Sequence, residues 1–293
     1  RRNIYLDRLT RYSDDGFTLS APTRYSVADW AKNLAALPRS RTLRRIRSHI
    51  TFNFVWATLV SLAYYVFIPS DFASTVDAFV PFSLSGGILG ILLAFRTSQS
   101  YDRFWHGRQT WAKVINRTRS LARISASYAT ADGFSHNAVL RWLVAFPEAL
   151  KQHLQGERTI AAFDSLKETE RRSLEACDHL PYACCYALSA EIDRIRAAKE
   201  SEQAAHGLVW WQMEFLLNAL QDCIGEPEAI AGTPVPLPYS SHTSRLLTLW
   251  TLSMPLVLVT RLPLITVPIA TVLVSWMLLA TEEIGHLIEE PFG

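Results

Sequence analysis

The sequence predicts an all-α integral membrane protein with four transmembrane helices and a polar helical bundle. Three observations support this fold class. Four apolar runs stand out, at residues 50–68, 79–95, 246–260 and 262–281. The stretch between the second and third runs is polar, with apolar residues at helical spacing and without the alternation typical of strands. Only 19% of the residues are charged and 49% are hydrophobic, whereas soluble domains carry about 25% charged residues.

These patterns divide the chain into five segments. The sequence predicts a basic N-terminal segment (1–49), two transmembrane helices (50–106), a helical bundle (107–238), two further transmembrane helices (239–285) and a C-terminal segment (286–293). We expect both ends of the chain and the bundle to lie on one side of the membrane, because four spans return the chain to the side on which it started.

The N-terminal segment 1–49 contains eleven Lys and Arg but four Asp and Glu, and its densest cluster is Arg39–His49. Such a cluster is typical of nucleic-acid binding, of anionic-lipid binding, or of the non-translocated side of a membrane protein. The uncharged run Ile50–Ile68 follows directly, which favours the last of these. The link from Pro69 to Ala78 has two Asp and no basic residue, which assigns it to the translocated side.

Two further expectations concern the N-terminal segment. Ser26–Leu34 has the pattern of a short amphipathic helix that lies in the membrane interface. The chain begins with Arg rather than Met, so we expect an upstream segment, such as a targeting peptide, to precede it.

The second apolar run, Phe79–Phe95, carries no charge and is just long enough to cross a hydrocarbon core of about 30 Å. Gly86 and Gly90 stand four residues apart, a spacing that lets helix backbones approach closely. Large apolar residues form a stripe on one helical face: Leu84, Ile88, Ile91 and Phe95. Such a helix either packs on a neighbour as an ordinary span or lines an axis with copies of itself. The periodicity alone favours the ordinary span.

The last third of the chain contains several helix boundaries. Gly225 and Pro227 predict the end of the last bundle helix. Thr243 or Ser244 is the expected N-cap of the third span. Between the last two apolar runs we expect a tight turn at Arg261–Pro263, because a single helix would place a charged Arg at the middle of the membrane.

Residue types that carry catalysis or bind metals show no recognisable arrangement. The eight His are scattered, and no pair has ligand spacing beside a third candidate on the same predicted helical face. The nucleophile, dinucleotide and phosphate-loop motifs are absent. Four Cys lack the spacing of a zinc site or a disulfide framework, so we interpret them as free core thiols: Cys177, Cys184, Cys185 and Cys223. We therefore predict no cofactor, no metal and no enzymatic activity.

Three segments carry a family resemblance. AFRTSQSYDRFWHGRQTW (Ala94–Trp111), GTPVPLPYSSHTSRLLTLW (Gly232–Trp250) and EEIGHLIEEPFG (Glu282–Gly293) resemble, in order, the three signatures of the bestrophin family of anion channels. Together with the runs between them, they cover most of residues 45–293. The resemblance is greatest to the plant and algal thylakoid branch, the voltage-dependent chloride channels.

The resemblance implies a homopentamer around one pore, with a neck built from the second helix. Alignment on the YDRFW motif places the neck positions on Gly87, Ile91 and Phe95, whereas the apolar stripe favours Ile88 in place of Gly87. No charge lies between Phe79 and Phe95, so the neck is expected to be a hydrophobic constriction.

Arg96 and Arg103 follow the neck in the sequence and would form a basic entrance that concentrates anions. For Arg103 and Arg108, a structural role in pairing with Asp102 or with the bundle is the favoured alternative. Family members pass chloride, nitrate and bicarbonate. The plant-type branch lacks the calcium cluster of animal members, so the resemblance implies gating without calcium, with voltage as the candidate trigger.

The expected function is therefore an anion-selective channel in the chloroplast thylakoid membrane, with both termini on the stromal side. Its expected partners are chloride and other small anions, the lipid bilayer and copies of itself, but not nucleic acid. The channel would serve ion balance or the supply of inorganic carbon. Two other classes stay open at this point: a non-conducting membrane scaffold whose helical middle binds partners, and a membrane enzyme.

Overall fold

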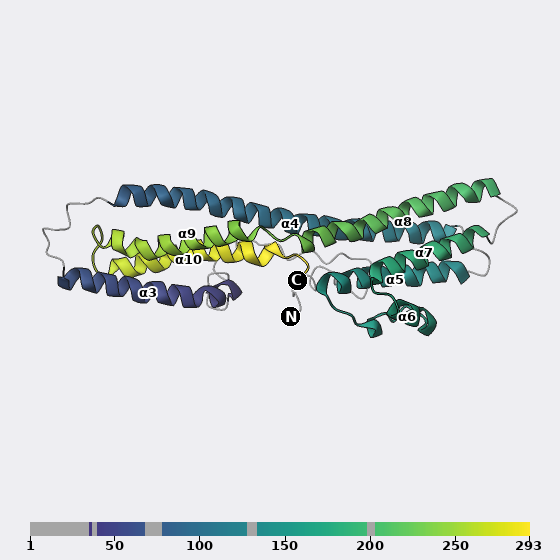
Figure 1. The fold of residues 1–293 in the computed structure, drawn as a ribbon, viewed down its shortest axis with the longest axis horizontal. Coiled ribbons are helices and arrows are strands. Elements are labelled where there is room, and N and C mark those ends of the chain that lie inside the picture. The colour runs from purple at the N-terminus through teal and green to yellow at the C-terminus, as the bar shows by residue number, and fades with distance from the viewer. Residues whose placement is uncertain (1–34, 37–39, 68–77, 128–133, 198–202) are drawn as a thin grey trace. The chain divides into compact units, whose positions relative to one another are not determined.

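The computed structural model describes residues 35–36, 40–67, 78–127, 134–197 and 203–293. Within these residues the regular structure is helical and contains no strand, which confirms the predicted all-α class (Figure 1). The expected interfacial helix Ser26–Leu34 lies outside the described residues, and so does the link up to residue 77.

The chain forms two compact units. The first, called here the span unit, comprises the described residues up to Ser100 together with Pro236–Leu287. The second, called the bundle unit, comprises Tyr101–Val235 and Ile288–Gly293. One 49-residue helix, α4 (Phe79–Ser127), contributes its first part to the span unit and its remainder to the bundle unit.

The span unit is built from the first part of α4 and three further helices: α3 (Arg41–Phe67), α9 (Leu237–Leu258) and α10 (Thr266–Glu289). Among the described helices, α3, α4 and α10 are long and apolar enough to cross a membrane. The 22-residue helix α9 is not in that group, because polar side chains such as His242 and Arg245 interrupt its apolar residues. The predicted count of four spans therefore stays a prediction.

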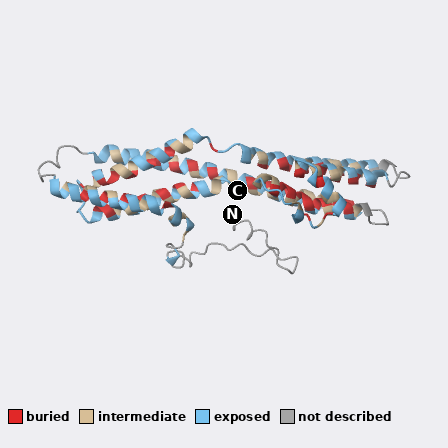
Figure 2. Ribbon diagram, turned by 60° about the horizontal axis from the view of Figure 1, so that its bottom comes forward, coloured by how far each residue is buried: buried red, intermediate tan, exposed pale blue. Residues whose placement is uncertain are grey.

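Figure 2 shows that buried residues lie along the helices of the span unit. Many of these buried residues have small or polar side chains. On α3 the buried positions include Asn53, Ala57 and Ser61, whereas Phe52 and Leu59 are exposed. Helices that pack in lipid use small residues at their contacts, because lipid provides no hydrophobic force that would drive large side chains inward. The burial pattern of α3 thus agrees with a membrane-spanning helix.

The turn predicted at Arg261–Pro263 is confirmed. Helix α9 ends at Leu258, whose carbonyl oxygen accepts hydrogen bonds from the backbone N–H groups of Arg261 (3.0 Å) and Leu262 (2.8 Å). The guanidinium of Arg261 lies 5.6 Å from the centre of the Phe79 ring, at the first residue of α4. The charge is therefore at the end of a span rather than in its middle.

The predicted N-cap at Thr243 or Ser244 is wrong. Helix α9 starts at Leu237, with Pro236 at the N-cap position and Pro238 in the first turn. Proline is tolerated there because the first N–H groups of a helix have no intrahelical partner. Thr243 is buried inside the helix, and its hydroxyl donates to the carbonyl of Tyr239 (3.1 Å).

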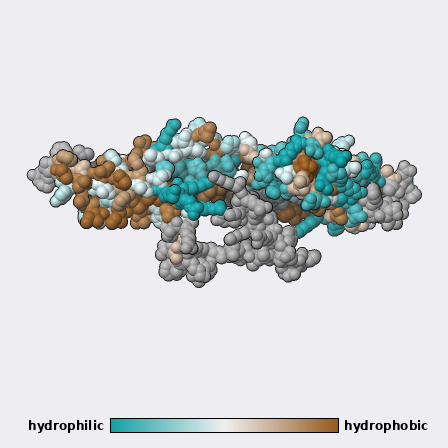
Figure 3. Space-filling view, turned by 90° about the horizontal axis from the view of Figure 1, so that it is seen from below, coloured by the Kyte–Doolittle hydropathy of each residue, from teal (hydrophilic) through white to brown (hydrophobic). Residues whose placement is uncertain are grey.

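In its described residues, the bundle unit contains the rest of α4 and four further α-helices: α5 (Phe134–Gln155), α6 (Glu168–Glu175), α7 (Leu180–Ala197) and α8 (Gln203–Gly232). A short 3-10 turn, η4 (Ile160–Ala162), precedes α6. Large apolar side chains from these helices form one core, which includes Phe146, Leu188 and Leu220. In the view of Figure 3 hydrophobic side chains gather on part of the span unit, whereas the visible surface of the bundle unit is mostly hydrophilic.

The helix end predicted at Gly225 and Pro227 is also wrong, because α8 continues to Gly232 with Pro227 inside it. Proline removes one backbone hydrogen bond, but the flanking turn is held by the buried side chains of Cys223 and Ile224.

The four cysteines are free, as predicted. Three of them are buried in the bundle core: Cys184, Cys185 and Cys223. Burial raises the pKa of the Cys185 thiol to about 12, so this residue is an inert core side chain. Cys177 departs from the prediction, because its side chain is exposed.

Candidate ion pathway

One face of α4 in the span unit is apolar and exposed. Its large side chains are those of the predicted stripe, and each is more than half exposed: Leu84, Ile88, Ile91 and Phe95. Gly87, the alternative neck position, is also exposed, and a Cβ placed there would meet nothing within 4 Å. The predicted neck residues therefore share an accessible surface of one helix, whichever of Gly87 and Ile88 belongs to the neck.

The opposite face of α4 is packed. Leu89 and Leu93 are buried in the span-unit core beside Leu247 of α9. Trp250 of α9 stacks on the Phe82 ring with 4.4 Å between ring centres, and its indole N–H donates to the Phe82 carbonyl at 3.3 Å. The exposed stripe thus lies on a helix whose opposite face packs against α9.

The two glycines predicted to allow close helix packing behave differently. A Cβ built on Gly86 would lie 2.9 Å from a ring carbon of Trp250, so glycine is required for this approach of α4 and α9. Gly90 is exposed, and a Cβ there would meet nothing within 4 Å. Within the span unit, Gly86 alone of this pair serves the contact.

The assignment of Arg96 to a basic entrance is wrong for this structure. Arg96 is only 2% exposed, and its guanidinium forms a 3.0 Å ion pair with buried Glu282 of α10. It also donates to a ring nitrogen of His286 at 2.8 Å. Because Glu282 neutralises its charge and the side chain is enclosed, Arg96 joins α4 to α10 instead of facing anions.

Arg103 has a structural role in the bundle unit, which was the favoured alternative in the sequence. Its guanidinium donates to the carbonyl oxygens of Thr233 (2.6 Å) and Ile230 (2.8 Å), and its Nε donates to that of Glu289 (3.1 Å). Ile230 lies in the last turn of α8, where unpaired carbonyl groups attract cations. The partners are carbonyl dipoles rather than a carboxylate, so the positive charge of Arg103 is not neutralised by them.

The end of the third signature packs against α4 within the bundle unit. A Cβ on Gly107 would lie 3.1 Å from the ring of Phe292 and 3.2 Å from Pro291. The carbonyl of Phe292 also accepts a hydrogen bond from the side chain of Gln155 (3.3 Å). The Pro-Phe-Gly ending and the glycine of the first signature are therefore two halves of one contact.

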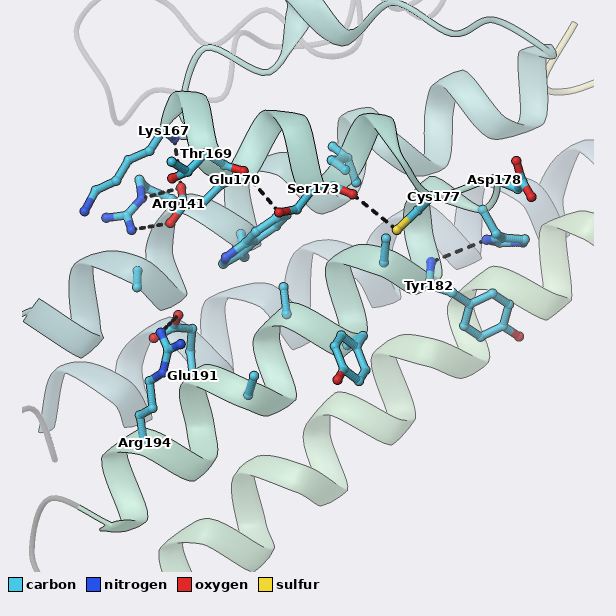
Figure 4. Close-up of a pocket in the computed structure, with 18 residues that line it drawn as sticks. Arg141, Lys167, Thr169, Glu170, Ser173, Cys177, Asp178, Tyr182, Glu191 and Arg194 are labelled. Atoms are coloured by element: carbon cyan, nitrogen blue, oxygen red, sulfur yellow. Dashed lines mark hydrogen bonds and ion pairs between the residues drawn. The ribbon is translucent and has the colours of Figure 1, made fainter.

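A cavity of about 780 Å³ lies among α5, α6 and α7 of the bundle unit (Figure 4). In its wall, Arg141 donates to both carboxylate oxygens of Glu170, at 3.0 and 2.6 Å. Burial by itself would raise the pKa of Glu170, but hydrogen bonds from Arg141 and from the backbone N–H of Lys167 together hold it below its usual value. Glu170 therefore stays ionised and ties α6 to α5.

The roles of Glu282 and His286 as partners of Arg96 were not predicted. They stand four residues apart on α10, which places them on one helical face. This spacing was the available signal, although nothing local could identify their partner, Arg96, which is 186 residues away from Glu282.

Comparisons with known proteins agree with the resemblance seen in the sequence. The profile of the family described as "Bacterial/Fungal Bestrophin protein" matches residues 23–293. A "Voltage-dependent anion channel-forming protein" of Nostoc is 34% identical over 82% of this chain and 76% of its own length. The "Voltage-dependent chloride channel 2, chloroplastic" of Arabidopsis thaliana is 31% identical over 92% of this chain and 68% of its own length.

The fold is similar to that of solved structures. The crystal structure of a bacterial bestrophin homolog from Klebsiella pneumoniae superposes with a TM-score of 0.76 at 26% identity, over 85% of this chain and 90% of that one. The family match covers most of the chain, and the relatives cover it at more than 30% identity. This protein belongs to the bestrophin family.

Proposed function

We propose that this protein is an anion-selective channel whose neck is lined by the exposed stripe of α4. The observation that carries the proposal is the two-sided character of this helix. Its stripe is apolar and open, while its opposite face is held by the α9 tryptophan. Relatives that match most of the chain bear the names of anion and chloride channels, which supports the same function.

The proposed neck works as a hydrophobic constriction. Rings of Ile91 and Phe95, with Gly87 or Ile88 above them, narrow the path to a few side chains, so that wetting of the neck controls conduction. The edges of aromatic rings carry partial positive charge, which favours an anion over a cation beside Phe95. Selectivity then needs no charged ring in the stretch from Phe79 to Phe95.

We propose a homopentamer, since one exposed stripe per chain encloses an axis only when several copies contribute. The bundle unit supports association, because large apolar side chains on its helices are exposed, among them Tyr186, Trp211 and Phe215. Of the two arginines expected at a basic entrance, only Arg103 keeps this role in the proposal.

We further propose that the channel resides in the chloroplast thylakoid membrane and passes chloride, with nitrate and bicarbonate as further anions. The chloroplastic relative supports the location. The arginines in the first turns of α3 and the acidic link that follows it favour a stromal position of both termini, by the positive-inside rule. Proteolysis of tagged termini in sealed thylakoid vesicles tests this orientation: exposed tags support it and protected tags contradict it.

The neck is tested by matched alanine substitutions and single-channel recording in planar bilayers. Phe95→Ala and Ile91→Ala are expected to widen the neck and to raise the conductance or the open probability. Phe52→Ala and Ile269→Ala are the controls, since the exposures of Phe52 (60%) and Ile269 (60%) match those of Phe95 (61%) and Ile91 (59%).

The controls remove the same side chains from α3 and α10, so they are expected to leave the anion current unchanged. If all four variants conduct like the parent, the α4 stripe does not line the pathway. If the parent itself passes no current, the non-conducting scaffold becomes the better account.

A further inference from the structure

Three metal-ligand side chains converge at one end of the bundle unit, and no part of the proposed channel uses them. His153 comes from the last turn of α5, His179 directly precedes α7, and Glu228 lies on α8. The Nε2 atoms of His153 and His179 lie 2.6 and 2.9 Å from the same carboxylate oxygen of Glu228. The three ligand atoms lie within 4.8 Å of one another.

The ligand set is typical of zinc and related transition metals. Two imidazoles and one carboxylate form a three-ligand site that leaves a fourth position to water. Calcium and magnesium, in contrast, prefer sites made of oxygen ligands alone. With metal–ligand bonds of about 2.0–2.2 Å in a tetrahedron, neighbouring ligand atoms stand roughly 3.3 Å apart. The two nitrogen–oxygen distances therefore need to open from 2.6 and 2.9 Å by about 0.7 and 0.4 Å to admit an ion.

The three side chains are accessible. Their exposures are 30%, 34% and 33% for His153, His179 and Glu228, so an ion can reach them without unfolding of the helices. His179 also lines the 780 Å³ cavity. Asp178 and Tyr182, which line the same cavity, lie at its end away from Arg141 (Figure 4). Of the three ligands, His179 is therefore reachable from this cavity.

One contact must change when an ion binds. The backbone N–H of Tyr182 points at Nδ1 of His179 over 3.4 Å. Coordination through Nε2 places the ring proton on Nδ1, so this long contact is lost. At 3.4 Å it is weaker than an ordinary hydrogen bond, and three coordinate bonds more than replace it.

We propose that His153, His179 and Glu228 bind a divalent transition-metal ion of the zinc class. Such an ion cross-links the ends of α5, α7 and α8, which already pack against one another. Each ligand comes from a different element, so no ligand pair shows a motif spacing in the sequence and no metal site was predicted. The ion would stabilise the bundle unit near Ile230, two residues beyond Glu228, where Arg103 holds the end of α8.

The test is a calorimetric titration of ZnCl₂ into the chelator-treated full-length chain in detergent. We expect one saturable site per protomer and a higher unfolding temperature with Zn²⁺, and no competition from Ca²⁺ or Mg²⁺. His153→Asn, His179→Asn and Glu228→Gln are each expected to weaken binding by at least the roughly 10–100-fold that loss of an outer-shell partner costs.

Two matched variants control for general effects of charge and histidine content. Glu226→Gln removes a carboxylate from α8 two residues from Glu228, and His106→Asn removes an exposed histidine from α4 of the bundle unit. Both are expected to bind Zn²⁺ like the parent. Equal affinity in the ligand variants and these controls would overturn the proposed site.

Cobalt substitution tests the ligand set in the unmodified protein, and so does not depend on the folding of any variant. Bound Co²⁺ is expected to show the strong visible bands of a four-coordinate site without a sulfur-to-cobalt charge-transfer band. A sulfur band would assign the ion to a cysteine such as exposed Cys177 and contradict the proposal, as would the weak spectrum of hydrated Co²⁺. Neither readout requires anion current, so failure of the channel proposal is distinguishable from failure of this one.

Discussion

In the bundle unit the fully buried side chains are mostly large and apolar, such as Phe146 and Leu188, whereas the span unit buries Asn53, Ser61 and Thr271. Exposed large apolar side chains, such as Phe52 and Leu59, are more numerous on the span unit than on the bundle unit. A helix in water gains free energy by burying apolar area, but a helix in lipid gains little from it and packs by close fit and polar contacts. The same type of element is thus stabilised by different interactions in the two units.

The largest effect is expected where the span unit buries a charge. Arg96→Ala leaves Glu282 buried without its partner, which typically costs about 3–5 kcal/mol. Arg45→Ala is the matched control, because Arg45 pairs with the neighbouring Glu283 but is 57% exposed, and such pairs contribute about 0–1 kcal/mol. Thermal unfolding in detergent measures both. Equal losses of stability in the two variants would mean that burial of the Arg96–Glu282 pair does not increase its contribution to stability.

The next largest effect is expected when a charge is introduced on the exposed surface of each unit. Leu59 is exposed near the middle of the apolar part of α3, where Arg raises the apparent insertion free energy by about 2.5–3.5 kcal/mol. Val144 is similarly exposed on α5, but an arginine there meets water. We expect Leu59→Arg to reduce membrane insertion in a glycosylation-mapping assay and Val144→Arg to have no effect. Normal insertion of Leu59→Arg would contradict a lipid-facing α3.

Close packing in the span unit is tested by two glycines of one helix. Gly86→Ala forces a methyl group against Trp250 and is expected to cost about 1–3 kcal/mol. Gly90→Ala meets open space and is expected to be neutral or to stabilise the helix by up to about 1 kcal/mol. Urea or thermal unfolding gives the sign of each change, and a stabilising Gly86→Ala would refute the contact.

The smallest effect concerns acid stability of the bundle unit. The pKa of Glu170 is lowered in the folded protein, so its charge contributes stability that is present above the usual pKa of 4.5 and is lost as the pH falls through the folded pKa. We expect Glu170→Gln to flatten this loss in thermal unfolding between about pH 6 and pH 3. Glu168→Gln on the same helix is the control, since Glu168 is mostly exposed. If the unfolding temperature of Glu170→Gln falls with pH as steeply as that of the parent, the stabilising role given to the Glu170 charge is contradicted.

Features that depend on residues close together in the sequence were predictable. The apolar runs marked α3, α4 and the turn after α9, because length and periodicity are local properties. The stripe of α4 was also predictable, as its four side chains share a face by spacing alone. Burial of Arg96 was not, because its partners Glu282 and His286 are brought to it only by tertiary packing.

Proline and histidine gave the least reliable local signals. Pro227 predicts a helix end, but packing of the neighbouring core residues carries α8 through it. His153 and His179 lie 26 positions apart, and only the packing of α5, α7 and α8 brings them to Glu228. A site assembled from three helices leaves no spacing in the sequence that a motif can describe.

The central claim is that the protein conducts anions, and the reversal potential of purified protein in a planar bilayer under a KCl gradient tests it most directly. The account predicts a value near the chloride equilibrium potential, with shifts on exchange to nitrate and bicarbonate that rank these ions. A value near the potassium equilibrium potential, or the absence of current in correctly folded protein, would contradict it.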